Sequence, residues 1–244
     1  MGDPPEENRS DQPENDRQNP SAGALESAER HIARSADTSS SCDGSGAAFT
    51  ATFSALVEWG QERDLIRKQS DFEFFARATD GHGDEHEAWY DAESKRWYKA
   101  TYLNRFGLAW GRDDTATVHE YLLRLLLQNM YFGDDIHLVA LISHEERMRV
   151  LISQPHIAGS PAKYDLTQRW FTELGFQKIE SDSIAWYYEP ANLLVADAHE
   201  GNVIQTAVGT LVPIDLNIIQ PKGLLLSGIQ LELYGQAQPM LPGF

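Results

Sequence analysis

The sequence lacks the features that mark several large classes of protein. Cysteine occurs once among the 244 residues, at Cys42 in a serine-rich stretch, so neither a disulfide framework nor a cysteine-based zinc site can be built. No apolar run approaches the roughly 18 residues that a membrane span needs. The opening residues MGDPPEENRSDQPEND also have no apolar core of the kind a signal peptide carries. We therefore expect a cytoplasmic protein without a membrane partner.

Positive charge is also scarce. Lys and Arg number 20 against 37 Asp and Glu, which gives a formal net charge of −17, and no run of basic residues interrupts this balance. A chain so acidic offers no electrostatic footprint for a phosphate backbone, so a nucleic-acid partner is not expected. The histidines at 119, 137, 144 and 156 are scattered without an H-x-x-x-H pair, so a zinc site is not expected either.

The chain divides into two regions of different composition. Residues 1–48 are rich in Pro, Glu, Asp, Asn and Ser and have almost no aromatic or β-branched residues. Such a segment cannot bury enough apolar surface to offset its ordering entropy, so we expect a disordered tail with at most a transient helix in AGALESAERHIARSA. This acidic tail is a candidate binding segment for a protein partner. Residues 49–244 are expected to form one folded domain.

Hydrophobic periodicity within the folded region predicts an α+β fold. A helix is expected near 49–69, followed by a hairpin whose strands are Glu87–Tyr90 and Arg96–Tyr102. The best helix signal covers 115–132, where Thr115 or Thr117 can act as the N-cap and a wide leucine face follows. The remaining predicted elements are strands at 135–143 and 147–155, a helix at 163–179, and short strands at 184–190, 192–196, 202–206 and 211–215. The tryptophans expected in the core are Trp89, Trp97, Trp110, Trp170 and Trp186.

Polar residues gather between the last of these apolar strands. Asp197, His199 and Asn202 lie in one loop, and Asp215 follows 13 residues after Asn202, at the end of the strand LVPID. Two antiparallel strands would bring Asn202 and Asp215 together as a pair of hard oxygen ligands, of the kind Mg²⁺ prefers when it also binds phosphates. Asp197 could then orient or deprotonate an attacking hydroxyl group. The alternative is a hairpin with ordinary turn-forming Asp and Asn residues.

The form of this loop, D-x-H-x-x-N followed later by I-D, resembles the catalytic loop and metal-binding Asp of protein-kinase-like phosphotransferases. It is closer to the aminoglycoside and choline kinase-like branch than to the eukaryotic kinases. It is also similar to the small Ser/Thr/Tyr kinase domain found within polyvalent proteins of phages and mobile elements. The resemblance implies catalysis by Asp197, metal binding by Asn202 and Asp215, and either a catalytic or a loop-bracing role for His199.

The same resemblance implies roles for residues far upstream. A kinase-like domain needs a strand Lys that contacts the nucleotide phosphates and a Glu on the next helix that holds it. Lys99 and Glu120 stand at these places, and Gln154, His156 and Ile157 stand where a hinge would bind adenine. The implied fold has two lobes, with an N-lobe at about 70–153, a hinge at about 154–159 and a reduced C-lobe at about 160–244. ATP and Mg²⁺ are the implied cofactors, and the acceptor is an unknown hydroxyl compound.

Several departures from the kinase pattern leave an alternative open. No G-x-G-x-x-G loop precedes the Lys99 strand, although Gly81 and Gly83 lie before it, and only 29 residues follow Asp215. A large helical lobe for peptide substrates does not fit into this remainder. The alternative to an active kinase is therefore a pseudokinase that serves as a nucleotide-binding or protein-interaction module.

Overall fold

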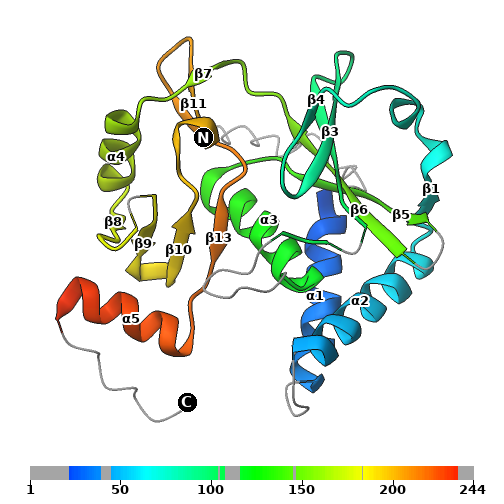
Figure 1. The fold of residues 1–244 in the computed structure, drawn as a ribbon, viewed down its shortest axis with the longest axis horizontal. Helices are drawn as coiled ribbons and strands as arrows, with labels where there is room; N and C mark the ends of the chain where they lie inside the picture. Colours follow the sequence, from blue (N-terminus) through cyan, green and yellow to red (C-terminus); the bar gives the residue numbers. More distant parts are fainter. Residues whose placement is uncertain are drawn as a thin grey trace, which may run out of the picture.

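The computed structural model describes residues 22–39, 45–103, 105–107, 116–144, 147–182 and 184–235, and it is an α+β structure (Figure 1). The α-helices are α1 (Ala22–Ser39), α2 (Ser45–Glu62), α3 (Val118–Phe132), α4 (Tyr164–Glu173) and α5 (Gly223–Tyr234). The strands are β1 (Ile66–Lys68), β2 (Gly81–His82), β3 (His86–Asp91), β4 (Arg96–Thr101), β5 (His137–His144), β6 (Arg147–Pro155), β7 (Gly159–Pro161), β8 (Gln177–Lys178), β9 (Trp186–Tyr188), β10 (Leu193–Ala196), β11 (Val203–Thr206), β12 (Leu211–Pro213) and β13 (Asn217–Ile219). Short 3₁₀ turns are η1 (Gln69–Asp71), η2 (Glu73–Ala76), η3 (Glu189–Ala191) and η4 (Glu200–Asn202).

The first half of the chain builds a six-stranded sheet in the order β1-β5-β6-β4-β3-β2. β1 runs parallel to β5, and the other neighbours are antiparallel. The predicted hairpin is confirmed as β3 and β4, because its alternating aromatic residues suit a pleated surface with one buried face. Lys99 faces Ala88 on one side and Ile152 on the other, so it lies in the interior of the sheet.

The predicted central helix is confirmed as α3. Thr117 is the N-cap, and a reciprocal capping box joins its side chain and backbone to those of Glu120. Gly133 ends the helix in the left-handed conformation, with φ at 66°. Because both ends are satisfied locally, this helix could be predicted from short-range signals alone.

Helix α1 differs from the expected disorder of residues 1–48. Residues 22–39 are helical, and Leu25 and Ile32 are fully buried with Ala24 and Ala28 in the main core. The helix packs against α2, α3 and β5. Isolated helices of this length are marginal, and burial of one apolar stripe against partners supplies the missing stability. Residues 1–21 lie outside the described residues, as do Cys42, Trp110 and Thr115.

The second half of the chain forms two smaller sheets, with orders β13-β10-β9-β8 and β12-β11-β7. The predicted short strands are confirmed as β9, β10, β11 and β12. α4 is shorter than expected because Gly175 adopts φ +87° and reverses the chain soon after Glu173. Helix α5 was not predicted, and it covers the sheet β13-β10-β9-β8 through Ile229.

Helix α3 joins the two halves. It contributes Leu122 and Leu125 to the core beside the six-stranded sheet and Leu127 to the core beneath β10 and β13. Figure 1 shows α3 between β5–β6 on one side and β13 on the other, and α3 contacts β13 directly. The helix is therefore the common support for residues of both halves.

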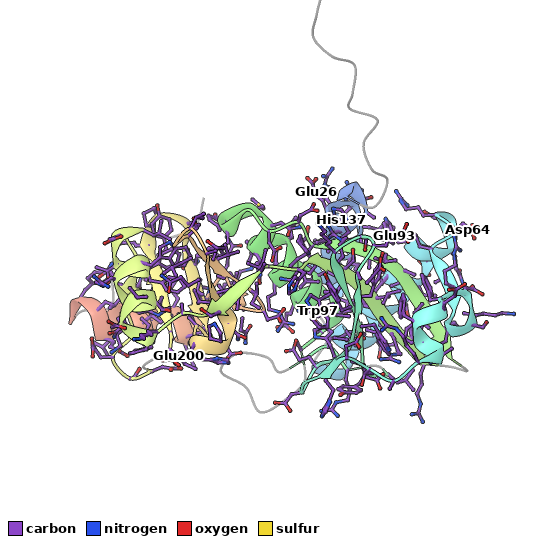
Figure 2. All side chains as sticks on the ribbon, turned by 90° about the horizontal axis from the view of Figure 1, so that it is seen from above. Glu26, Asp64, Glu93, Trp97, His137 and Glu200 are labelled. Atoms are coloured by element: carbon purple, nitrogen blue, oxygen red, sulfur yellow. The ribbon has the colours of Figure 1, made fainter. Side chains whose placement is uncertain are left out.

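Acidic side chains are exposed on the part that contains the six-stranded sheet. Glu26, Asp64 and Glu93 are examples, and Figure 2 labels all three on this part. Trp89 and Trp186 are buried as predicted, whereas Trp97 and Trp170 are only partly buried. None of the described helices has the length and apolar character needed to cross a membrane.

Candidate functional site

The loop after β10 holds the first of the predicted site residues. All four residues of β10 are buried, which fixes the backbone up to Ala196. Asp197 then takes φ 62°. The Nδ2 atom of Asn202 donates hydrogen bonds to the Asp197 backbone oxygen at 2.9 Å and to the Asp197 Oδ2 atom at 3.0 Å. The loop is therefore closed on itself by the side chain of Asn202.

Asp215 lies beside this loop, in the connection between β12 and β13. The Asn202 Nδ2 atom is 3.3 Å from the Asp215 backbone oxygen, and the Ile214 N–H donates to the Asn202 backbone oxygen at 2.7 Å. Asp215 also has a positive φ, of 52°. Left-handed backbone at a non-glycine residue costs free energy and is found more often at functional sites. Its occurrence at both Asp197 and Asp215 therefore supports this region as a candidate site.

Lys99 reaches Asp215 from the six-stranded sheet. Its Nζ atom lies 2.5 Å and 2.6 Å from the two carboxylate oxygens of Asp215 and 2.7 Å from Oε1 of Gln154. The Lys99 side chain is only 11% exposed, whereas that of Asp215 is 47% exposed. Burial raises the pKa of Asp215, but the charge and hydrogen bonds of Lys99 outweigh it and hold that pKa below its usual value.

The pKa of Asp197 is shifted in the opposite direction to that of Asp215. Burial raises the pKa of Asp197 above its ordinary value, although His199 and the hydrogen bond from Asn202 lower it. His199 lies with its Nε2 atom 3.4 Å from Asp197 Oδ1, and its Nδ1 atom accepts the Gly201 N–H at 2.9 Å. The ring therefore braces the loop and also faces Asp197. With its raised pKa, the Asp197 carboxylate is suited to accept a proton.

Glu120 does not take the place that the kinase resemblance implies. One of its carboxylate oxygens accepts hydrogen bonds from the Thr117 N–H at 2.7 Å and the Thr117 hydroxyl at 3.0 Å. It therefore caps the start of α3, and the Nζ atom of Lys99 bonds to Asp215 and Gln154 instead. The predicted Lys99–Glu120 pair is not formed, because Glu120 lies in the first turn of the helix.

The three predicted hinge residues differ in burial and in hydrogen-bond partners. Gln154 is 3% exposed and turns its side chain inward to Lys99. The His156 backbone N–H donates to the Lys95 oxygen at 2.9 Å, and its ring accepts the Trp97 indole N–H at 3.1 Å. Ile157 is half-buried just after β6. Trp97 is on the same face of β4 as Lys99, and Figure 2 labels it within the part formed by the six-stranded sheet.

A second group of charges near the site was missed at the sequence level. Arg124 of α3 forms a two-pronged ion pair with Glu85, at 2.9 Å and 2.5 Å, in the turn before β3. His86 bonds to the Tyr121 hydroxyl at 2.8 Å, and burial lowers the pKa of His86 to about 4. Arg124 is embedded in a leucine-rich helix, and a charged residue within an apolar face is the signal that could have revealed it.

The oxygen atoms available here suit Mg²⁺ better than a transition metal. Asp215 offers a carboxylate, and the Nδ2 atom of Asn202 is committed to Asp197, which leaves its amide oxygen as a ligand atom. Within the described residues, no three His, Cys, Asp or Glu side chains form a metal-binding cluster. One carboxylate and one amide oxygen fit a metal that takes its remaining ligands from phosphates and water.

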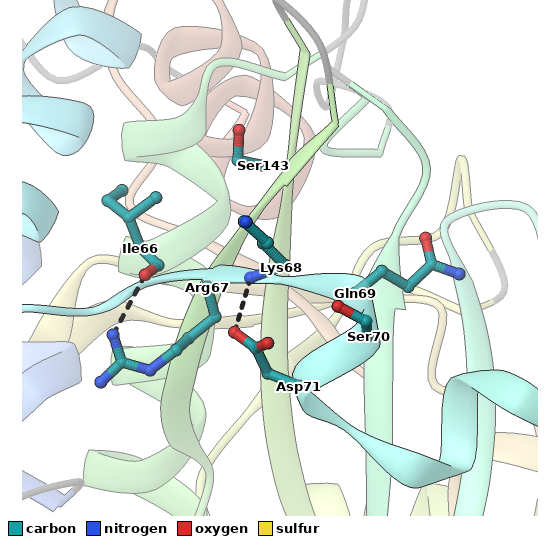
Figure 3. Close-up of a pocket in the computed structure, with 7 residues that line it drawn as sticks. All are labelled: Ile66, Arg67, Lys68, Gln69, Ser70, Asp71 and Ser143. Atoms are coloured by element: carbon teal, nitrogen blue, oxygen red, sulfur yellow. Dashed lines mark hydrogen bonds between the residues drawn. The ribbon is translucent and has the colours of Figure 1, made fainter.

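A surface hollow lies away from this site. It measures about 930 Å³ and is lined by residues 66–71 and Ser143, at the edge where β1 meets β5 (Figure 3). Arg67 bonds to the Ile66 oxygen, and Asp71 accepts the Lys68 N–H, so these polar groups are used within the hollow's own wall. The candidate site around Lys99 and Asp215 is therefore identified by its converging charged side chains and not by this hollow.

The chain matches a known protein family. The family model for serine/threonine/tyrosine kinases found in polyvalent proteins matches residues 52–220, which include Lys99, Asp197, Asn202 and Asp215. No curated protein and no solved structure matches the chain. The matched range covers more than half of the chain and ends just after β13. The chain therefore belongs to the family of serine/threonine/tyrosine kinases found in polyvalent proteins.

Proposed function

We propose that this protein is an ATP- and Mg²⁺-dependent phosphotransferase that moves the γ-phosphoryl group to a hydroxyl acceptor, either a protein Ser, Thr or Tyr or a small molecule. The observation that carries the proposal is the convergence of Lys99 with Asp215, Asn202 and Asp197. In this proposal the six-stranded sheet belongs to the N-lobe and the two smaller sheets belong to a reduced C-lobe, joined by the hinge at 154–159.

Lys99 is proposed to hold the nucleotide phosphates. Its ammonium group is nearly buried and already faces a carboxylate, so phosphate oxygens would bind it in a poorly solvated environment. Gln154 orients the ammonium group through its side-chain oxygen. Asp215 and Asn202 would hold Mg²⁺, which when bound neutralises charge on the transferring phosphoryl group.

Asp197 is proposed to be the catalytic base. It would accept the proton of the acceptor hydroxyl as that oxygen attacks the γ-phosphorus of ATP and the bond from this phosphorus to the β–γ bridging oxygen breaks, which releases ADP. The raised pKa of Asp197 makes its carboxylate a better proton acceptor. Asn202 fixes the orientation of Asp197 through its amide, and His199 supports the loop. Most of the rate enhancement would come from positioning and charge stabilisation.

The test is transfer of labelled γ-phosphate from MgATP to the protein itself and to a panel of peptide and small-alcohol acceptors. Asp197→Asn is the matched variant, because it keeps the shape of the loop and removes the base. We expect transfer by the wild type and a loss of about 10²–10⁴-fold in the variant, with nucleotide binding retained. Binding of MgATP without transfer to any acceptor would overturn the enzyme proposal.

A second candidate function is a nucleotide-binding or protein-interaction module without turnover. It is favoured by the use of Glu120 as a helix cap, because an assembled kinase site pairs the helix glutamate with the strand lysine. The two candidates differ in one result. The module predicts that Asp197→Asn leaves cellular function intact, and the enzyme predicts that it does not.

A further inference from the structure

Two buried glutamines meet at one carboxylate behind the site. Gln128 of α3 is 1% exposed and Gln154 of β6 is 3% exposed. Buried amides must be hydrogen-bonded, and each of these donates its Nε2 atom to the same Oδ2 atom of Asp134, at 2.7 Å in both cases. Asp134 lies just after the C-cap of α3, and its other oxygen accepts the Asp135 N–H at 2.8 Å.

The opposite ends of the two glutamines point at the two halves of the site. With its nitrogen committed to Asp134, Gln154 turns its oxygen to the Lys99 ammonium at 2.7 Å. Gln128 likewise turns its oxygen to the Leu216 N–H at 3.2 Å, and Leu216 directly follows Asp215. The ion pair of Lys99 and Asp215 closes the circuit.

We propose that Asp134 is a positioning residue, whose carboxylate orients Gln128 and Gln154 so that they hold Lys99 and the Asp215 backbone in register. This inference rests on the phosphotransferase function proposed above. It assigns to Asp134, Gln128 and Gln154 the task that Glu120 does not perform, because Glu120 caps the helix. The circuit connects β4 and β6 with α3 and the segment before β13.

The hub requires an acceptor oxygen. Both glutamines donate to the same Oδ2 atom, and an amide oxygen can also accept two hydrogen bonds, so Asp134→Asn can keep both bonds with its oxygen at this position. In Asp134→Leu, which is similar in size and has no acceptor, each glutamine loses this partner or rotates. A rotated glutamine would present its NH₂ group to the Lys99 ammonium or to the Leu216 N–H, both of which are donors.

The buried charge of Asp134 lowers the stability of the folded protein at neutral pH. Burial raises its pKa above the ordinary value, although hydrogen bonds from Gln154, the Asp135 backbone and Gln128 lower it. A carboxyl whose pKa is raised in the folded state binds its proton more tightly there, so stability falls as pH rises from the ordinary pKa through the raised one. Removal of the charge at neutral pH is thus expected to leave the thermal midpoint unchanged or higher.

The experiment compares Asp134→Leu with Asp134→Asn and with Asp135→Asn in the full chain. Asp135 is the neighbouring residue in the same loop, and its exposed side chain pairs with Arg96 instead. We expect Asp134→Leu to weaken MgATP binding or transfer by roughly 10–100-fold, as losses of orienting groups around a metal site do. Asp134→Asn should recover most of this loss, and its thermal midpoint should not fall. Asp135→Asn should keep wild-type binding and transfer.

A readout that needs no nucleotide is hydrogen exchange at the Leu216 amide. We expect this exchange to be at least about tenfold faster in Asp134→Leu, because the Gln128 oxygen is no longer held against the amide. Asp134→Asn should recover the slow exchange, because its oxygen can accept the Gln128 NH₂ group and keep the Gln128 oxygen on Leu216.

The outcomes separate the two proposals. If wild-type protein binds no MgATP, the phosphotransferase proposal fails, and Leu216 exchange still decides whether the circuit exists. If Asp134→Leu keeps both wild-type MgATP binding and slow Leu216 exchange, the positioning role is overturned. Loss of binding in Asp134→Leu with unchanged Leu216 exchange, or without recovery in Asp134→Asn, would also overturn it.

Discussion

The Lys99 ammonium lies 2.6 Å from Oδ2 of Asp215, although 116 residues separate them in the sequence. One residue comes from the interior of the six-stranded sheet and the other from the connection before β13. The Asn202 side chain donates to the Asp215 backbone oxygen and to the Asp197 carboxylate, so the four residues form one continuous group. Each prediction below follows from a contact within this group or from the elements that support it.

The pH dependence of transfer should follow Asp197. The base must be ionised, and burial raises its pKa, so kcat/KM should fall as pH decreases through a value above the ordinary Asp pKa of about 3.9. His199 lowers the pKa of Asp197, so His199→Gln should move this acid limb to higher pH. The check is a pH–rate profile with circular dichroism at each pH. An unchanged limb in His199→Gln would contradict the assignment.

Glu120→Ala should affect the fold rather than the site. Its carboxylate caps α3 at Thr117, so its loss should reduce the free energy of unfolding by about 1 kcal/mol, as losses of helix caps do. MgATP affinity should remain at the wild-type value. Urea denaturation and calorimetric binding measure the two quantities, and Thr117→Ala serves as the matched cap variant. A large loss of affinity in Glu120→Ala alone would restore the pairing with Lys99.

Helix α1 should contribute to the stability of the domain. Ile32 is fully buried in the core that also contains residues of α2 and α3. Ile32→Ala should therefore lower the free energy of unfolding by about 2–5 kcal/mol. Arg30→Ala on the same helix removes only an exposed pair with Glu26 and should change it by less than about 0.5 kcal/mol. Equal effects of the two substitutions in urea denaturation would show that α1 does not pack as described.

Gly159→Ala should disturb the strand pair beside the loop that holds Asp197 and Asn202. A Cβ atom at Gly159 would meet the Gln205 backbone oxygen at 2.3 Å, where β7 pairs with β11. The two strands would have to separate, at a cost of about 1–3 kcal/mol. The neighbouring Ser160→Ala is the control, because it adds no atoms. Amide exchange in residues 203–206 should increase in Gly159→Ala only.

Several elements could be predicted because their signals are local. The hairpin β3–β4 and helix α3 each carry alternation, capping or apolar periodicity within their own residues. The site loop could be found because Asp197, Asn202 and Asp215 follow buried strands in the order of a known motif. Helix α1 could not be predicted as stable, because its stability depends on burial against segments that are distant in the sequence.

Side-chain partners were harder to predict than elements. Glu120 and Lys99 are on the expected helix and strand, but their contact depends on which turn of α3 faces β4. A carboxylate in the first turn has backbone N–H groups within reach, and Glu120 uses them. Asp134 gave no signal because its partners, Gln128 and Gln154, lie on different elements and meet only after folding.

The most direct test of the account is calorimetric titration of ATP with and without Mg²⁺, in the wild type and in Asp215→Asn. Asp215 is assigned to the metal, so Mg²⁺ should strengthen ATP binding in the wild type by about tenfold or more and should have little effect in the variant. Binding without Mg²⁺ should persist in both proteins. Absence of ATP binding by the wild type, or an equal effect of Mg²⁺ in both proteins, would contradict the account.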